Sequence, residues 1–202
     1  AGFRVILPDS RSQGRSGWSP VPITYELMAD DVLGLLDHLG IADADIVGWS
    51  DGAIVGIHLA IEHRDRLGRV VAYGANVSPE GLLPLADDPA FETILAQMAA
   101  EYQRLSPQPE RFEELFAQLG ALYGTEPNFT TAELQGISNP FLVVDGANEE
   151  LVKPDQPTLL AASIPDAQLV IMPGTGHFAP LEQPDEFARI ILAFLNGQTV
   201  ET

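Results

Sequence analysis

The stretch Gly48-Trp-Ser-Asp-Gly52 joins two segments with different periodicities, and this junction decides the fold. Residues 44–47 form an apolar run typical of a buried strand, whereas residues 53–63 carry apolar side chains at helical spacing. A G-x-S-x-G sequence between a strand and a helix forces its serine into a strained backbone conformation that flanking glycines accommodate. The pattern predicts a sharp turn that holds the Ser50 hydroxyl in the open.

The same turn also has a purely structural interpretation. In that case the two glycines allow close packing and Ser50 caps the following helix. Under either interpretation the first turn of the helix presents the backbone N–H of Asp51, a donor suited to a developing negative charge. Other motifs in the chain are needed to distinguish an exposed nucleophile from a helix-capping serine.

The composition describes one globular domain with at most a small insertion. The chain has 202 residues, of which 46% are hydrophobic, and a net charge of −19. This acidic balance argues against nucleic acid as a partner, and the lack of a long apolar run argues against a membrane-spanning helix. The absence of cysteine excludes disulfides, thiolate metal sites and a cysteine nucleophile. Because no signal-like segment opens the chain, we expect a cytoplasmic location.

Predicted strands and helices alternate along the chain. Strands are expected at Phe3–Leu7 and at 44–47, 69–73, 141–144 and 167–172. Helices are expected at 25–39 (with Thr24 as N-cap), 53–63, 155–163 and 185–195, and the region 79–134 is polar and helical. Strands separated by helices imply parallel crossovers and a three-layer α/β sheet.

Four motifs together resemble the α/β-hydrolase superfamily. The first is the serine turn, and the second is the loop 8–16, Pro-Asp-Ser-Arg-Ser-Gln-Gly-Arg-Ser, in which Ser12 stands where the family usually has glycine. The third is the strand and acid turn at 140–149, and the fourth is Gly174-Thr-Gly-His-Phe178 with the helix that follows. They keep the order serine, acid, histidine expected of this fold. The resemblance implies a hydrolase core at 1–77 and 137–202, a helical cap at 78–136, and chemistry without cofactor or metal.

The candidate general base is His177. A serine hydroxyl is a weak nucleophile at neutral pH and needs a base within hydrogen-bond reach, which an imidazole supplies. His177 lies in the glycine-rich loop after the last predicted strand, the family's catalytic histidine loop. His38, His58 and His63 lie on predicted helices, and we interpret them as structural or surface residues.

The acid that orients His177 has three candidates. The family spacing after Gly146 ends at Glu149, a glutamate in place of the usual aspartate. Asp145 is the alternative acid and Glu150 a third choice. Glu149 and Glu150 are also compatible with being solvated loop charges.

The front of the chain departs from the family pattern. Family members have several strands and an oxyanion loop ahead of the segment that begins here at Ala1, so the resemblance describes an N-terminally truncated form. Either Phe3–Leu7 pairs directly with the strand before Ser50, giving a sheet of about five strands, or another chain supplies an edge, as in a possible homodimer. The backbone at 10–12 is a candidate for the second oxyanion donor, which is missing with that loop.

The substrate is expected to be a small carboxylic ester or lactone. The serine turn and the segment 73–76 are similar to the valacyclovirase-like and ring-fission branch of the superfamily. Trp49 and Trp18 are candidates for lining the pocket. The Asp51 carboxylate is a candidate partner for a cationic substrate group, or favours the helix N-terminus.

These residues point to a serine hydrolase of the carboxylesterase or lactonase type, acting through an acyl-enzyme. Ser50 attacks, His177 transfers the proton, Glu149 orients His177, and the Asp51 N–H receives the oxyanion. The alternative is a catalytically impaired domain of the same fold that binds a small molecule or a protein, which the departure at the front of the chain favours. A third option, acyl transfer to another acceptor, is separable by product analysis.

Overall fold

The sheet has four parallel strands in the order of the sequence. The computed structural model describes residues 2–84 and 89–200, with the side chains of 89–92 left undescribed. The strands are β1 (Ala44–Trp49), β2 (Leu67–Tyr73), β3 (Phe141–Gly146) and β4 (Gln168–Met172), each hydrogen-bonded to the next. The strands are parallel, so their carboxyl ends lie at the same end of the sheet. The serine turn, Gly74 and the acid turn follow directly there.

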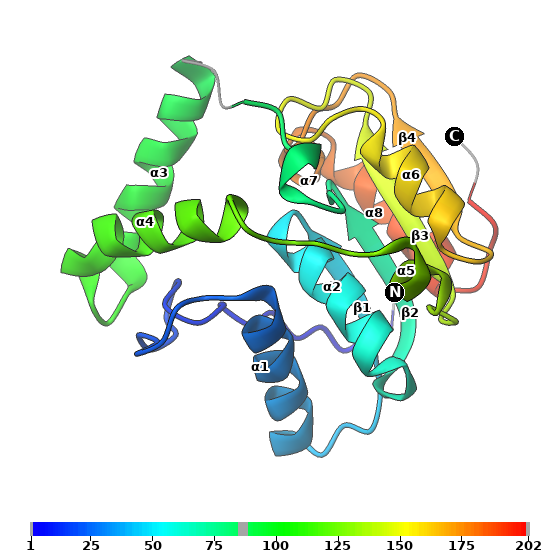
Figure 1. Ribbon diagram of the computed structural model, residues 1–202, viewed down its shortest axis with the longest axis horizontal. Coiled ribbons are helices and arrows are strands. Elements are labelled where there is room, and N and C mark those ends of the chain that lie inside the picture. Colours follow the sequence, from blue (N-terminus) through cyan, green and yellow to red (C-terminus); the bar gives the residue numbers. More distant parts are fainter. Residues whose placement is uncertain (1, 85–88, 201–202) are drawn as a thin grey trace.

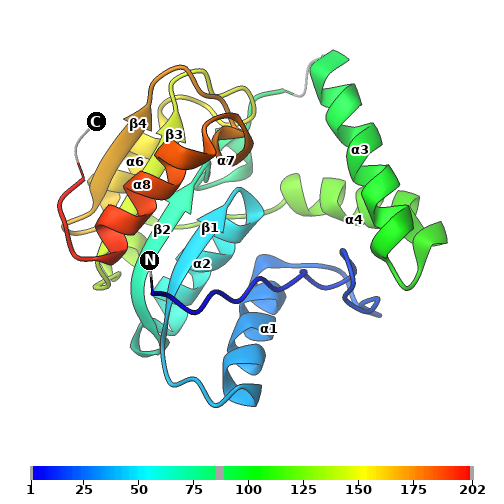
Figure 2. The same cartoon turned by 180° about the vertical axis from the view of Figure 1, so that it is seen from behind.

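Helices cover both faces of this sheet and make three layers (Figures 1 and 2). On one face lie α2 (Asp51–Glu62), α6 (Gln156–Ser163) and, packed against α2, α1 (Tyr25–His38). On the other face α8 (Pro184–Leu195), preceded by the short α7 (Ala179–Glu182), packs on β2, β3 and β4. The three-layer α/β architecture is confirmed.

The start and end of α1 follow from local chemistry. The Thr24 hydroxyl accepts a hydrogen bond from the Leu27 N–H at 3.1 Å, as the N-cap prediction requires. After His38 the chain passes through Gly40 at φ +66°, a left-handed conformation in which glycine is not strained.

The predicted strand at Phe3–Leu7 is wrong. The segment is irregular, and Val5 and Leu7 are 72% and 88% exposed. A strand is stabilised by hydrogen bonds to a neighbour, and in the described part of the chain β1 pairs only with β2. The direct pairing expected between Phe3–Leu7 and the strand before Ser50 does not form, and Figure 2 shows the N-terminal segment as a coil beyond the β1 side of the sheet.

The segment 78–136 is helical, as expected. Its described residues form two single-turn helices, η2 (Pro79–Gly81) and η3 (Pro109–Arg111), and three α-helices, α3 (Pro89–Leu105), α4 (Phe112–Tyr123) and α5 (Thr131–Gln135). In Figures 1 and 2, α3 and α4 stand apart from the sheet. The apolar face of α4 is buried through Leu115, Leu119 and Leu122, whereas Met98 on α3 is 52% exposed. The helical spacing of the sequence also predicts Phe91 on the same face of α3 as Met98, but Phe91 lies outside the described side chains.

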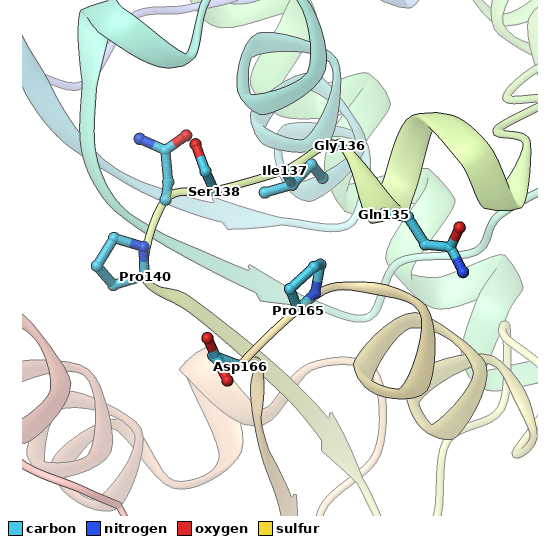
Figure 3. A pocket seen from close by; sticks show the side chains of 8 residues that line it. Gln135, Gly136, Ile137, Ser138, Pro140, Pro165 and Asp166 are labelled. Carbon is cyan, nitrogen blue, oxygen red and sulfur yellow. The ribbon is translucent and has the colours of Figure 1, made fainter.

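A shallow groove of about 440 Å³ lies at the opposite end of the sheet from Ser50 (Figure 3). Its lining residues, 135–140 and 165–166, precede β3 and β4, so they belong to the amino ends of these strands. Ligands of open parallel sheets bind outside the carboxyl ends of the strands, so the binding site is expected at the end of the sheet where Ser50 lies and not at this groove.

Within the two described ranges, no helix has the length and apolar character needed to span a membrane.

Candidate active site

Ser50 lies at a strained turn between β1 and α2. Its backbone has φ +55° and ψ −119°, and its N–H donates to the Tyr73 carbonyl of β2 at 2.8 Å. The hydroxyl makes no capping hydrogen bond to α2. A left-handed φ at a non-glycine residue costs on the order of 1–3 kcal/mol, so the capping interpretation leaves this strain without a purpose.

Only one of the two flanking glycines is sterically required. A Cβ on Gly48 would lie 2.2 Å from the Gly52 carbonyl oxygen, whereas a Cβ on Gly52 would have nothing within 4 Å. The close contact in this turn is therefore between the backbone of position 48 and the first turn of α2.

The first turn of α2 offers a backbone donor beside Ser50. The N–H groups of Ala53 and Ile54 donate to the Ser50 carbonyl. Among the described backbone hydrogen bonds, none uses the N–H of Asp51. This N–H is free at the positive end of the helix dipole, where an anionic oxygen is stabilised.

His177 and Glu149 form a buried pair. The ring nitrogen Nδ1 of His177 lies 2.9 Å from Oε1 and 3.0 Å from Oε2 of Glu149, and the two side chains are 4% and 3% exposed. Because the partner is a carboxylate, Nδ1 carries the proton and Nε2 is left with a free lone pair. The structure thus brings together an imidazole and the carboxylate that fixes its tautomer.

The surroundings of Glu149 favour its ionised form. Oε1 also accepts the backbone N–H groups of Leu151 at 2.8 Å and Val152 at 3.0 Å. Burial alone raises the pKa of this carboxyl, but hydrogen bonds from His177, Asp145 and Leu151 and the charge of His177 bring it below its ordinary value. The buried pair with His177 excludes the interpretation of Glu149 as a solvated loop charge.

The two other candidate acids contact different groups. Asp145 is 1% exposed and accepts the Gly146 N–H at 2.8 Å, and burial together with the neighbouring Glu149 carboxylate raises its pKa to about 8. Oε2 of Glu150 accepts the backbone N–H of His177 at 2.9 Å. Neither is hydrogen-bonded to the imidazole, so both support the pair from outside.

The histidine loop is fixed by side chains from distant parts of the chain. The indole Nε1 of Trp49 donates to the His177 carbonyl at 2.8 Å, and the Tyr73 hydroxyl donates to the Gly176 carbonyl. Glu182 accepts the Gly176 N–H at 2.9 Å. Trp49 is a candidate for lining the pocket, and its indole N–H is used to hold the loop.

Gly74 is a site residue whose role sequence reasoning missed. It lies after β2 at φ +65°, and a Cβ there would be 2.9 Å from Cε1 and 3.0 Å from Nδ1 of His177. The imidazole therefore packs directly on the Gly74 backbone. A glycine directly after a predicted strand was the available signal for this close approach.

Both chain neighbours of Ser50 interact with His177. Trp49 does so by the hydrogen bond described above, and the Asp51 carboxylate does so electrostatically. Among the described residues, no hydrogen bond links the Ser50 hydroxyl to His177. In unliganded enzymes such bonds are often long and tighten when substrate binds.

The Asp51 carboxylate is held by two tyrosines that the sequence did not single out for the site. Tyr25 of α1 donates to Oδ1 at 2.8 Å, and Tyr123 of α4 donates to Oδ2 at 3.0 Å. Burial raises the pKa of Asp51, and these two hydrogen bonds and His177 offset part of the rise. Burial and the Asp51 charge raise the pKa of both tyrosines. These partners lie 26 and 72 residues away, so no local pattern indicates them.

The N-terminal loop uses its polar groups internally. The Ser12 N–H donates to the Gly17 carbonyl at 3.0 Å, and the Ser12 hydroxyl accepts the Ser19 N–H at 2.8 Å. Of the candidate second oxyanion donors at 10–12, the Ser12 amide is thus already bonded. Ser12 also adopts φ +64°, the conformation suited to the glycine that the family usually has there. Trp18 packs beneath the Arg111 guanidinium, whose carbon lies 3.6 Å from the ring centroid.

Comparisons with known proteins show which family the chain is similar to. A model of the alpha/beta hydrolase family matches residues 1–190. A 2-hydroxy-6-oxo-6-phenylhexa-2,4-dienoate hydrolase from Burkholderia cepacia is 30% identical over 98% of this chain and 79% of its own length.

Two solved structures are similar over most of the chain. The enol-lactonase from Burkholderia xenovorans LB400 has a TM-score of 0.71 at 27% identity, covering 93% of this chain and 79% of that one. A thermophilic esterase from Thermogutta terrifontis has a TM-score of 0.71 at 26% identity, covering 98% and 82%. With the family model matching most of the sequence, this chain belongs to the alpha/beta hydrolase family.

Proposed function

We propose that the chain is a serine hydrolase that cleaves small carboxylic esters or lactones through an acyl-enzyme. The observation that carries the proposal is the buried His177–Glu149 pair, whose free Nε2 belongs to a loop held by the residue preceding a strained, uncapped Ser50. A structural serine turn needs neither the pair nor the strain.

The proposed reaction starts with attack of the Ser50 Oγ on the substrate carbonyl carbon. The hydroxyl proton passes to Nε2 of His177, and the Glu149 carboxylate stabilises the imidazolium that forms. The Asp51 N–H receives the negative charge of the tetrahedral intermediate. Collapse transfers the proton to the leaving alkoxide, and attack by water on the acyl-enzyme repeats these steps and frees Ser50. In a lactone the leaving alkoxide stays attached to the acyl group.

The residues 78–136 are proposed to act as a cap over this site. Supporting this role, Tyr123 of α4 contacts Asp51, the residue next to Ser50. Trp18 and Arg111 pack together where the N-terminal loop meets η3, and the Trp18 ring is proposed to line the entrance. With two tyrosine hydroxyls on its carboxylate, Asp51 is proposed to recognise polar or cationic substrate groups together with them.

The substrate class rests on the relatives. An enol-lactonase and an esterase are among the similar solved structures, and a dienoate hydrolase is among the relatives. All of these names describe hydrolysis, and two of them name the ester or lactone class.

The test is intact-mass analysis after exposure to a fluorophosphonate, with Ser50→Ala as the matched control. Labelling of the wild type alone, followed by turnover in a panel of small esters and lactones, is the expected result. A folded protein without labelling would contradict the proposal and favour a binding domain. That outcome would be consistent with the irregular Phe3–Leu7 segment and the single identified oxyanion donor.

A further inference from the structure

The segment that leads from β2 into the region 78–136 is paired with the residues that follow the acid turn. Residues 81–83 and 151–153 run antiparallel, with an isolated bridge between Leu82 and Val152. We call this pairing the entry ladder, and it joins segments that are far apart in the sequence. On each side of the bridge lies one further backbone hydrogen bond, from the Leu83 N–H to the Leu151 carbonyl at 2.9 Å and from the Lys153 N–H to the Gly81 carbonyl at 2.8 Å.

The entry ladder sets the direction of a backbone donor to Glu149. The Leu151 carbonyl, which accepts from Leu83, belongs to the same peptide unit as the Val152 N–H. A peptide unit is planar and trans, so its C=O and N–H point in opposite directions. The Leu83 N–H holds one side of this unit, and the other side donates to Oε1 of Glu149 at 3.0 Å. Because the unit turns as a whole, a fixed carbonyl also fixes the N–H.

Backbone donors hold the carboxylate of Glu149 beside His177. Oε1 accepts the N–H groups of Leu151 at 2.8 Å and Val152 at 3.0 Å, and the same oxygen lies 2.9 Å from Nδ1 of the imidazole. The side chain of Glu149 is 3% exposed, so water has little access to replace a lost donor. Hydrogen bonds to an ionised carboxylate are among the strong ones. The direction of the Val152 N–H therefore affects how the carboxylate faces the ring.

The entry ladder is itself seated on α6. The side chain of Gln156, in the first turn of that helix, is buried, and its Oε1 accepts the Val77 N–H at 3.0 Å. A Cβ on Gly81 would lie 2.4 Å from the same oxygen, so the amide packs directly on the backbone at position 81. The Gln156 N–H donates to the Lys153 carbonyl at 3.0 Å. Gln156 thus contacts both segments of the ladder.

We propose that the entry ladder is a positioning element of the active site. The Leu83 N–H holds the peptide unit from which the Val152 N–H is aimed at Glu149, and the carboxylate is thereby kept against the imidazole. The inference rests on the proposed function and adds to it a positioning residue, Leu83, that acts through its backbone. Leu83 does not touch the reacting atoms and acts on them only through Glu149.

A positioning role and a merely structural role of the ladder affect different kinetic constants. Glu149 stabilises the imidazolium that forms in the transition state. Its misorientation therefore lowers kcat and leaves KM nearly unchanged. A ladder that only anchored the cap would, when broken, loosen the residues over the substrate and raise KM.

The first test compares Leu83→Pro with Leu83→Ala in steady-state hydrolysis of an ester that Ser50 cleaves. Proline lacks the N–H, and the preceding Leu82 already has φ −81° and ψ 145°, the extended backbone that a residue before proline adopts. Alanine removes the side chain and keeps the N–H, so it is the matched control. We expect Leu83→Pro to lower kcat about 10–100-fold with KM within about threefold of the wild type, and Leu83→Ala to stay within about threefold in both constants.

A second variant breaks the ladder by another route. In Gly81→Ala the added methyl group overlaps the Gln156 amide, while every N–H of the ladder remains. We expect a loss of kcat of about tenfold with KM nearly unchanged. Gly120→Ala, whose methyl group meets nothing within 4 Å, is its control. Circular dichroism shows which variants are folded, and if Leu83→Pro is not, the comparison of Gly81→Ala with Gly120→Ala decides, with equal kcat values overturning the inference.

The final test does not need activity. The Nδ1 proton of His177, which faces Glu149, is expected to give a downfield ¹H NMR resonance that shifts in Leu83→Pro and persists in Leu83→Ala. An unchanged resonance, a kcat equal to that of Leu83→Ala, or an effect confined to KM would each overturn the inference. Absence of fluorophosphonate labelling of the wild type would count against the proposed function instead, and the NMR comparison would still decide whether the ladder holds the pair.

Discussion

The two glycines that flank Ser50 have different steric surroundings. A methyl group at position 48 would overlap backbone atoms of Gly52 and Ala53, which have no freedom to move away, whereas position 52 is open. Glycine is therefore sterically required at position 48 and not at position 52.

This asymmetry predicts different outcomes for two substitutions of the same size. We expect Gly48→Ala to lower the free energy of unfolding by about 3 kcal/mol or more because β1 and α2 are forced apart. Gly52→Ala should change it by less than about 1 kcal/mol, with the sign favouring stability in a helix. Chemical denaturation of both variants measures the difference in the free energy of unfolding. Equal effects would show that the close approach of position 48 to the Gly52 backbone does not require glycine there.

The three carboxyl groups near His177 have separable roles. Glu149 is hydrogen-bonded to the ring, Glu150 to the backbone of the loop, and Asp145 to the Gly146 N–H. Replacing Glu149 by glutamine allows the imidazole to turn to the wrong tautomer and removes the charge that stabilises the imidazolium.

We expect Glu149→Gln to reduce kcat about 10²–10⁴-fold, as loss of the acid does in serine hydrolases. Glu150→Gln should reduce kcat by less than about tenfold, since its amide oxygen still accepts the His177 N–H. Steady-state kinetics on the preferred ester makes the comparison. A larger loss of kcat in Glu150→Gln than in Glu149→Gln would show that Glu149 is not the residue that orients His177.

At the scale of elements, the contact between α4 and the serine turn links the residues 78–136 to the core. The Tyr123 hydroxyl is the group that makes it, and Tyr25 of α1 approaches the same carboxylate of Asp51 from the other side. A hydrogen bond to an ionised carboxylate is stronger than one between neutral groups.

Removal of this hydroxyl should loosen α4 from α2. We expect Tyr123→Phe to lower the free energy of unfolding by about 1–3 kcal/mol, and to raise KM more than it lowers kcat if α4 covers the substrate. Thermal unfolding and kinetics test both parts.

Tyr102→Phe is the matched control for this prediction. The Tyr102 hydroxyl on α3 is buried and has no hydrogen-bond partner, so its loss should not destabilise the protein. Equal destabilisation by the two substitutions would mean that the Asp51 contact contributes nothing specific.

At the scale of the whole molecule, the edge of the sheet formed by β1 is open in the described part of the chain. On the far side from β2, β1 has no partner strand among the described residues, Val47 on this strand is 46% exposed, and the adjacent N-terminal segment exposes Val5 and Leu7. Unpaired backbone groups next to apolar side chains favour pairing with another chain.

We expect this edge to make the chain associate, as in the possible homodimer. Light scattering over a range of concentrations should give a mass that rises above 21.7 kDa. A lysine at position 47 disfavours edge pairing, so Val47→Lys should restore the monomer mass. A monomer mass for the wild type at every concentration would contradict the prediction.

The predictions that succeeded from sequence depend on neighbours in the chain. The apolar runs at β1 to β4, the Thr24 cap and the strand-to-helix turn at Ser50 each follow from a few consecutive residues. The Phe3–Leu7 strand was wrong for the complementary reason. Its apolar residues fit a strand, but a strand also requires a partner, and its own sequence holds no information on whether one is present.

The sequence by itself determined the α/β class, the order of elements and the candidate Ser50, His177 and Glu149, because periodicity and short motifs are local properties. Only the tertiary structure decided which carboxylate contacts the imidazole, that Gly74 forms the surface on which the ring packs, and that Tyr25 and Tyr123 hold Asp51. Glu149, Glu150 and Asp145 lie within six residues of one another and carry the same functional group. What separates them is their direction relative to a loop 28 residues further along the chain, and packing alone fixes that direction.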